Sequence, residues 1–115
     1  MKDRIRSFGY AFRGIRALVA SEVNARIHLA ATIAVVALGI ASHLSSGEWT
    51  AMILAISTVW SAEAMNTAIE KLADRTAPER HPLVRTAKDV AAAGVLIASL
   101  GALAVGLVVF LPRFA

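Results

Sequence analysis

Long apolar runs separated by short polar segments dominate the chain. The first run covers residues 27–44 and is interrupted by few polar side chains, and the last run, residues 90–111, contains no charged residue. The middle run is apolar at its start but becomes polar after Ala62. About 20 largely apolar residues are needed to cross a bilayer as a helix. The pattern therefore predicts three membrane-spanning helices, at about 25–44, 50–72 and 88–111.

The segment before these runs has a different periodicity. Apolar side chains recur at steps of three and four residues, and arginines flank the apolar stripe (Ile5, Phe8, Phe12, Ile15 and Val19, with Arg6, Arg13 and Arg16). This spacing is typical of an amphipathic helix. We expect a helix at about residues 3–20 that lies on the membrane surface. The alternative is a cap over the cytoplasmic loops that does not touch the membrane.

Composition narrows the class of protein. Apolar residues make up 57% of the 115 residues, and only 17% are charged, against about 25% in soluble domains. This excludes a disordered chain and argues against a small soluble globule. The absence of cysteine excludes thiolate chemistry. A formal charge of +4 would also suit nucleic-acid binding, but so high an apolar fraction favours a membrane, and no nucleic-acid partner is expected. The length allows a single domain, residues 1–115.

The distribution of Lys and Arg predicts the orientation. Six lie in residues 1–26 and five in 71–89, whereas the turn at 45–49 has none and the C-terminus has Arg113 alone. Because basic loops stay on the cytoplasmic side, the N-terminus and the 73–87 loop are predicted to be cytoplasmic. Three spans agree with this count and four do not. We expect a multi-pass protein of the cell's inner membrane, with an outer turn at Ser45-Ser46-Gly47.

The second predicted span carries a polar stripe. Glu63, Asn66, Glu70 and Asp74 are spaced so that they share one helix face, within an arc of roughly 80°. Glu63 should lie within the hydrocarbon, near its cytoplasmic edge. A carboxylate at that depth costs about 2.5–3.5 kcal/mol or more, and such residues are usually functional. The alternative is that Glu63 is a structural hydrogen-bonding residue between helices.

Further polar residues should reach the same depth. Antiparallel pairing of the first two spans brings Glu22 near Glu70, and two carboxylates there need a proton or a cation between them. Oxygen ligands of this kind suit Mg²⁺, which also takes phosphate oxygens into its shell. Lys88 is then a positive charge for a phosphate, unless it only reaches towards the interface. Asp89 would also fit a capping box, Thr86 to Asp89, at the start of the third span.

Other motifs are less informative. There is no glycine-rich phosphate loop, so any nucleotide must be held by side chains on helices. His28 and His43 stand at the two ends of the first span and are interpreted as interfacial residues rather than ligands, and the spacing of His81 matches no metal motif. Small residues at four-residue steps in the third span suit close helix packing (Gly94, Ala98, Ala102 and Gly106).

These motifs together resemble those of a known family. The segment from Glu63 to Asp74, EAMNTAIEKLAD, followed by His81-Pro82-Leu83 and then by Ala87-Lys88-Asp89, resembles the small prokaryotic diacylglycerol kinase family. The resemblance covers nearly the whole chain. Glu22-Val23-Asn24 with Ile27-His28, and the ending at Val108 to Arg113, are similar to its undecaprenol kinase branch.

The resemblance implies a fold and a set of roles. Members are all-α integral membrane lipid kinases with a surface helix and three spans, typically homotrimers whose active sites are shared between subunits. It implies Glu63 as general base, also in contact with the lipid substrate, and Glu22 and Glu70 as Mg²⁺ ligands. The ATP-binding residues that it implies are Tyr10, Glu22, Asn66, Glu70, Asp74, Glu79, His81, Lys88 and Asp89. Arg80 stands where an aromatic residue often lies in diacylglycerol-type members.

The resulting expectation is an enzyme that uses ATP and Mg²⁺ to phosphorylate a membrane lipid alcohol at the cytoplasmic face. Undecaprenol is the first candidate and diacylglycerol the second. A small proton-coupled transporter would also have an intramembrane glutamate, but it needs four spans. A non-catalytic scaffold or an inactive kinase is the third possibility, although every expected chemical residue is present.

Overall fold

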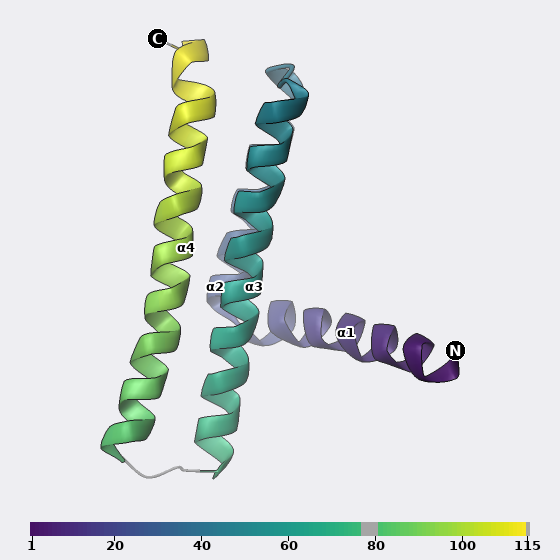
Figure 1. Ribbon diagram of the computed structural model, residues 1–115, viewed down its shortest axis with the longest axis vertical. Helices are drawn as coiled ribbons and strands as arrows, with labels where there is room; N and C mark the ends of the chain where they lie inside the picture. The colour runs from purple at the N-terminus through teal and green to yellow at the C-terminus, as the bar shows by residue number, and fades with distance from the viewer. Residues whose placement is uncertain (77–80, 115) are drawn as a thin grey trace.

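The chain folds into four helices. The computed structural model describes residues 1–76 and 81–114, and this part contains no strand. Figure 1 shows the order of the helices, which are α1 (Lys2–Ser21), α2 (Val23–Ala41), α3 (Ser46–Thr76) and α4 (Pro82–Phe114). The prediction of an all-α protein with an N-terminal helix and three further long helices is confirmed.

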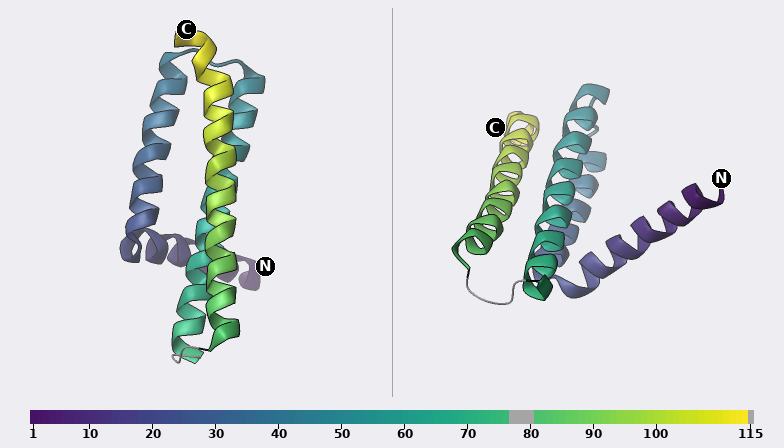
Figure 2. Two further views of the ribbon diagram at one scale, coloured as in Figure 1. Left: turned by 90° about the vertical axis from the view of Figure 1, so that its left-hand side faces the viewer. Right: turned by 60° about the horizontal axis from the view of Figure 1, so that its bottom comes forward.

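Helices α2, α3 and α4 run alongside one another, and α1 projects away from them (Figures 1 and 2). In the described residues, these three helices are long and apolar enough to cross a membrane. Large apolar side chains on them point outward and are exposed, among them Ile33, Ile53, Leu100 and Val108. Such a surface suits contact with lipid tails, and the chain is a multi-pass membrane protein.

The elbow between α1 and α2 is a single extended residue. Glu22 has φ −117° and ψ 122°, and its backbone N–H donates to the carbonyl of Leu18. Arg26 donates from its guanidinium to the carbonyls of Val19 and Ala20, at 3.2 and 3.1 Å. Those carbonyls have no partner within the helix because α1 ends here. The elbow therefore turns the chain sharply while the carbonyls of Leu18, Val19 and Ala20 stay hydrogen-bonded.

Helix α2 ends in a Schellman motif. His43 has φ 53°, in the left-handed region, and its N–H donates to the carbonyl of Ile40 at 3.3 Å. The N–H of Leu44 donates to the carbonyl of Gly39 at 3.4 Å. These two bonds satisfy carbonyls that the helix end leaves free, and they bring the buried Leu44 side chain back over the last turn.

Helix α3 begins with a capping box one residue later. The N–H of Glu48 donates to Ser45 Oγ at 3.2 Å, and the N–H of Ser45 donates to Glu48 Oε1 at 2.9 Å. This reciprocal pair is the S-x-x-E arrangement that starts helices. The expected turn at Ser45-Ser46-Gly47 lies earlier than predicted, at residues 42–45, because Ser46 and Gly47 already belong to α3. Arg113 at the end of α4 binds the same Glu48 carboxylate and fixes α4 to this end of the bundle.

Helix α4 is longer than the predicted third span of about 88–111, and the predicted capping box does not form. Helix α4 begins at Pro82, before the predicted start at residue 88, and the Thr86 hydroxyl donates to the carbonyl of Pro82 at 3.0 Å inside its first turns. Thr86 to Asp89 is therefore not a capping box. A proline suits the first helical position because it has no N–H to leave unsatisfied. At the other end the helix continues through Pro112 to Phe114 rather than ending before it.

Gly39 permits the close approach of α2 and α3 beside the turn. A Cβ at this position would lie 2.8 Å from Trp49 Cη2 and 3.1 Å from Leu44 Cδ1. We expect Gly39→Val to lower the free energy of unfolding by about 1–3 kcal/mol, as overpacking a filled site does. Thermal or SDS-induced unfolding in detergent micelles measures this. Gly101→Val is the matched control, because no atom lies within 4 Å of a Cβ there; equal losses in both variants would contradict the prediction.

Candidate active site

The buried polar residues of the described chain lie together on one face of α3. Glu63 is only 2% exposed, and Asn66 and Thr67 are also buried. Helices α1 and α2 both contact α3, and Leu18 near the end of α1 and Ala25 near the start of α2 are buried as well. The prediction that Glu63 and Asn66 share an inward face of the second span agrees with this placement. Glu70, one turn further on, is partly exposed, and Asp74 is exposed.

Three oxygen atoms on this face have no hydrogen-bond partner. They are Glu63 Oε2, Asn66 Oδ1 and Thr67 Oγ1. A buried polar atom without a partner costs about 1–3 kcal/mol, so such atoms call for an explanation. Three of them within two turns of one helix are suited to contact a bound polar group, such as a substrate hydroxyl.

Beyond this buried face, charged residues pair towards the end of α3. The Lys71 amine lies 3.8 Å from Glu22 Oε1, and Asn66 donates to Glu70 Oε1 at 3.4 Å. The elbow residue Glu22 therefore lies beside the turn of α3 that carries Glu70, as the pairing of the first two spans predicted. The cation nearest to Glu22, however, is Lys71, which the sequence analysis had not selected.

Lys88 joins α3 to α4. Its ammonium group lies 2.6 Å from Asp74 Oδ1, and the Lys88 side chain is one-third exposed. Figure 1 shows that these ends of α3 and α4 extend beyond the level at which α1 leaves the bundle. The two residues predicted to act near phosphates are thus in direct contact, and they lie at the end of the bundle that carries the 76–82 connection.

The carboxylates at this end meet the needs of Mg²⁺ only in part. The described residues hold no group of three or more His, Asp or Glu side chains that would bind a metal alone. Mg²⁺ is usually held by one or two carboxylates together with substrate phosphates and water. Glu22 lies beside Lys71, the residue that follows Glu70, so the two carboxylates belong to neighbouring parts of α3 and the elbow.

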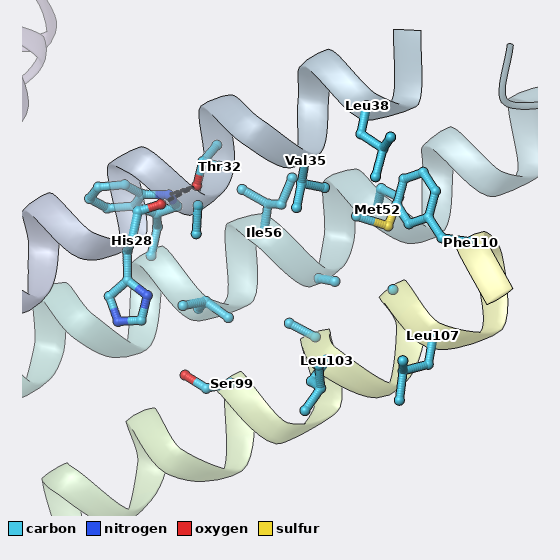
Figure 3. Close-up of a pocket in the computed structure, with 16 residues that line it drawn as sticks. His28, Thr32, Val35, Leu38, Met52, Ile56, Ser99, Leu103, Leu107 and Phe110 are labelled. Carbon is cyan, nitrogen blue, oxygen red and sulfur yellow. Dashed lines mark hydrogen bonds between the residues drawn. The ribbon is translucent and has the colours of Figure 1, made fainter. Parts of the chain in front are cut away.

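An apolar cavity of about 420 Å³ lies between α2, α3 and α4. Figure 3 shows its side chains, with His28, Thr32 and Ser99 towards one end and Leu38, Met52 and Phe110 towards the other. His28 is also the residue whose Nε2 lies 3.5 Å from Glu63 Oε2. The cavity therefore begins beside the buried carboxylate and runs along the bundle towards the α2–α3 turn, with an almost entirely apolar lining.

Comparison with known proteins decides the family. The model of the prokaryotic diacylglycerol kinase family matches residues 9–110. The chain belongs to this family. It is 39% identical to the undecaprenol kinase of Bacillus subtilis (strain 168) over 108 residues, 94% of this chain and 88% of that protein. It is 36% identical to a diacylglycerol kinase of Synechocystis sp., over 92% of this chain and 61% of that protein. A diacylglycerol kinase of Escherichia coli (strain K12) is 32% identical, over 82% and 77%.

This member of the prokaryotic diacylglycerol kinase family is a lipid kinase, with ATP as the phosphate donor. The transporter hypothesis is therefore wrong, and the described chain of the kinase has three candidate spans rather than four. The resemblance inferred from the motifs is confirmed.

Of the other residues predicted to bind the nucleotide, three are exposed and a fourth lies outside the described residues. Tyr10 is exposed on α1, with the Arg13 guanidinium 4.7 Å from its ring centroid. Asp89 is exposed and lies 3.4 Å from Arg85 Nε on the same helix. His81 is exposed, and its Nδ1 accepts a hydrogen bond from the N–H of Leu83 at 3.1 Å. Glu79 lies outside the described residues.

Two residues at this site were not predicted from the sequence, Thr67 on the buried face of α3 and His28 on α2, which contacts that face. His28 was interpreted as interfacial, but it contacts Glu63. Thr67 was not selected, because a single threonine among apolar residues of a membrane helix does not by itself indicate a functional site. The signal for His28 was available: it and Glu63 are about equally far in sequence from the turn at Ser45, and antiparallel helices bring such residues to the same level.

Proposed function

We propose that this kinase transfers the γ-phosphoryl group of ATP to the hydroxyl of undecaprenol at the cytoplasmic face of the inner membrane. The observation that carries the proposal is the buried Glu63 carboxylate, with an unpartnered oxygen, beside the end of an apolar cavity. A lipid alcohol presents the same combination, a single hydroxyl on a long apolar chain.

The choice of undecaprenol rests on two supports. The relative that is 39% identical carries the name undecaprenol kinase, and Glu22-Val23-Asn24 with Ile27-His28 resembles that branch. Diacylglycerol is the second candidate, because other relatives, at 36% and 32% identity, are named diacylglycerol kinases.

The chemistry follows from the placement of the charged residues. Glu63 accepts the proton of the lipid hydroxyl as that oxygen bonds to the γ-phosphorus, and the bond to the β-phosphate oxygen breaks, so that its electron pair leaves with ADP. Lys88 and Asn66 contact the phosphates, and Asp74 orients Lys88. Glu22 and Glu70 would hold Mg²⁺, which supplies neutralisation of phosphate charge. Phosphoryl transfer depends mainly on such positioning and charge stabilisation.

Orientation and assembly belong to the same proposal. The eleven Lys and Arg residues of segments 1–26 and 71–89 support a cytoplasmic N-terminus and a cytoplasmic 73–87 loop. A homotrimer with shared sites is supported by the family resemblance. It also accounts for Tyr10 and Asp89, which are exposed within one chain and which the resemblance places on the nucleotide.

Phosphate transfer from γ-labelled ATP tests this function. Purified protein in detergent–lipid micelles is offered undecaprenol or diacylglycerol, each with Mg²⁺ and with EDTA. We expect labelled undecaprenyl phosphate, formed faster than phosphatidic acid and only with Mg²⁺. Faster labelling of diacylglycerol would assign the second candidate. ATP binding without product from either lipid, by folded protein, would indicate an inactive kinase.

Filling the cavity should weaken binding of the lipid substrate and leave ATP binding unchanged. Ala102 lines the cavity from α4, so Ala102→Trp places an indole where the lipid chain would lie. We expect the KM for undecaprenol to rise about 10-fold or more, which corresponds to the free energy of burying a few methylene groups. The KM for ATP should be unchanged. Ala104→Trp, at an exposed position on the same helix outside the cavity lining, is the matched control. An unchanged lipid KM in Ala102→Trp would place the lipid chain elsewhere.

A further inference from the structure

His28 is the one partner that the described chain offers to the buried carboxylate of Glu63. Its Nε2 lies 3.5 Å from Glu63 Oε2, the oxygen that lacks a hydrogen bond. The His28 side chain is 23% exposed, whereas that of Glu63 is 3% exposed. The imidazole thus contacts the buried carboxylate and also lines the cavity between α2, α3 and α4.

Two neighbouring side chains contact His28, Thr32 at its backbone carbonyl and Trp60 at its ring. The indole N–H of Trp60 on α3 donates to Thr32 Oγ1 on α2 at 3.0 Å, the dashed bond in Figure 3. The same Thr32 hydroxyl donates to the backbone carbonyl of His28 at 2.7 Å. The Trp60 and His28 rings then meet edge to face, with centroids 6.4 Å apart and planes at 63°. This chain of contacts ties the level of α2 that carries His28 to the level of α3 that carries Glu63.

We propose that His28 is a positioning residue for Glu63. With its proton on Nε2, the imidazole donates to Glu63 Oε2, which stabilises the charged carboxylate and turns Oε1 towards the lipid hydroxyl. A buried ionised carboxylate is costly without such a donor, and a hydrogen bond to the charged form offsets that cost. The inference rests on the proposed role of Glu63 as general base. It adds a residue that neither the sequence motifs nor the polar face of α3 had assigned to catalysis.

Two amide substitutions separate this role from packing. The side-chain nitrogen of glutamine can occupy nearly the position of His28 Nε2, whereas asparagine is one methylene shorter and does not reach Glu63. Both are uncharged and polar, and both remove the aromatic ring that packs against Trp60. A difference between His28→Gln and His28→Asn therefore reports the hydrogen-bond donor and not the packing.

The test measures kcat and KM for undecaprenol and for ATP in the full-length protein in lipid micelles. We expect His28→Asn to lower kcat roughly 10- to 100-fold, as removal of a group that orients a reactive ligand does, with both KM values nearly unchanged. His28→Gln should retain most of kcat. Thermal unfolding and size-exclusion profiles of the two variants establish that both are folded.

The outcomes distinguish this inference from the proposed function. Equal kcat in His28→Asn and wild type, or equal loss in the Asn and Gln variants, would overturn the positioning role while leaving lipid phosphorylation intact. If wild-type protein phosphorylates no lipid alcohol, the proposed function itself fails. Full activity in a Glu63→Gln variant would instead show that Glu63 is not the general base, and the inference about His28 would fail with it.

Discussion

Replacing Glu63 with glutamine should abolish most lipid phosphorylation and leave the protein folded. The amide fits the same volume on the buried face of α3 but accepts no proton, so the lipid hydroxyl would have to lose its proton to water. General-base catalysis contributes about 10²- to 10⁴-fold, and we expect kcat to fall by that factor. Labelled-ATP turnover with undecaprenol measures the loss. The KM for ATP should change little, because Glu63 lies deeper than the charged pairs formed by Lys71 and Lys88.

The control for this experiment lies on the same helix. Glu48 caps the first turn of α3 and binds Arg113 at the opposite end of the bundle. Glu48→Gln should lower thermal stability slightly and leave kcat unchanged. Wild-type turnover in Glu63→Gln would assign proton acceptance to another group and make the buried glutamate a structural residue, the alternative that the sequence had left open.

The second large effect is expected at Lys88. In the structure its ammonium contacts Asp74, and it is the charged group by which α4 meets the polar end of α3. If it stabilises charge on the transferred phosphate, Lys88→Met should lower kcat/KM for ATP by about 10²- to 10³-fold, the cost of removing one such donor. Initial rates at varied ATP and saturating lipid measure this loss.

Two further variants define the role of Lys88. Arg75→Met removes a positive charge from an exposed position in the last turn of α3 and should leave the rate unchanged. Asp74→Asn breaks the contact with Lys88 but keeps its charge, so its effect on kcat/KM should be smaller than that of Lys88→Met. Equal losses in Lys88→Met and Asp74→Asn would mean that the ion pair holds α3 and α4 together and that Lys88 acts on no phosphate.

Local signals in the sequence predicted the number and order of the helices, but they did not predict where each helix begins and ends. The run from 90 to 111 carries no charge and is long enough to cross a bilayer as a helix, in which every backbone group is hydrogen-bonded within the segment. The start of that helix was misplaced, since Pro82 begins it and the Thr86 pattern lies inside it. A capping pattern marks the start of a helix only where the residues before it are not helical. Whether they are helical depends on the connection that precedes them. The capping box that does form, at Ser45 and Glu48, follows a helix end that the pattern of apolar residues did not define.

By itself, the sequence determined that this is a helical membrane protein with a polar stripe in its second span, and its motifs determined the kinase family. Helical periodicity and the cost of charges in lipid are properties of single segments, so they can be read along the chain. Only the tertiary structure decided that Lys71 is the partner of Glu22, that Lys88 contacts Asp74, and that His28 faces Glu63. Those contacts join different helices, and their distances depend on how the helices rotate and pack, which no single segment specifies.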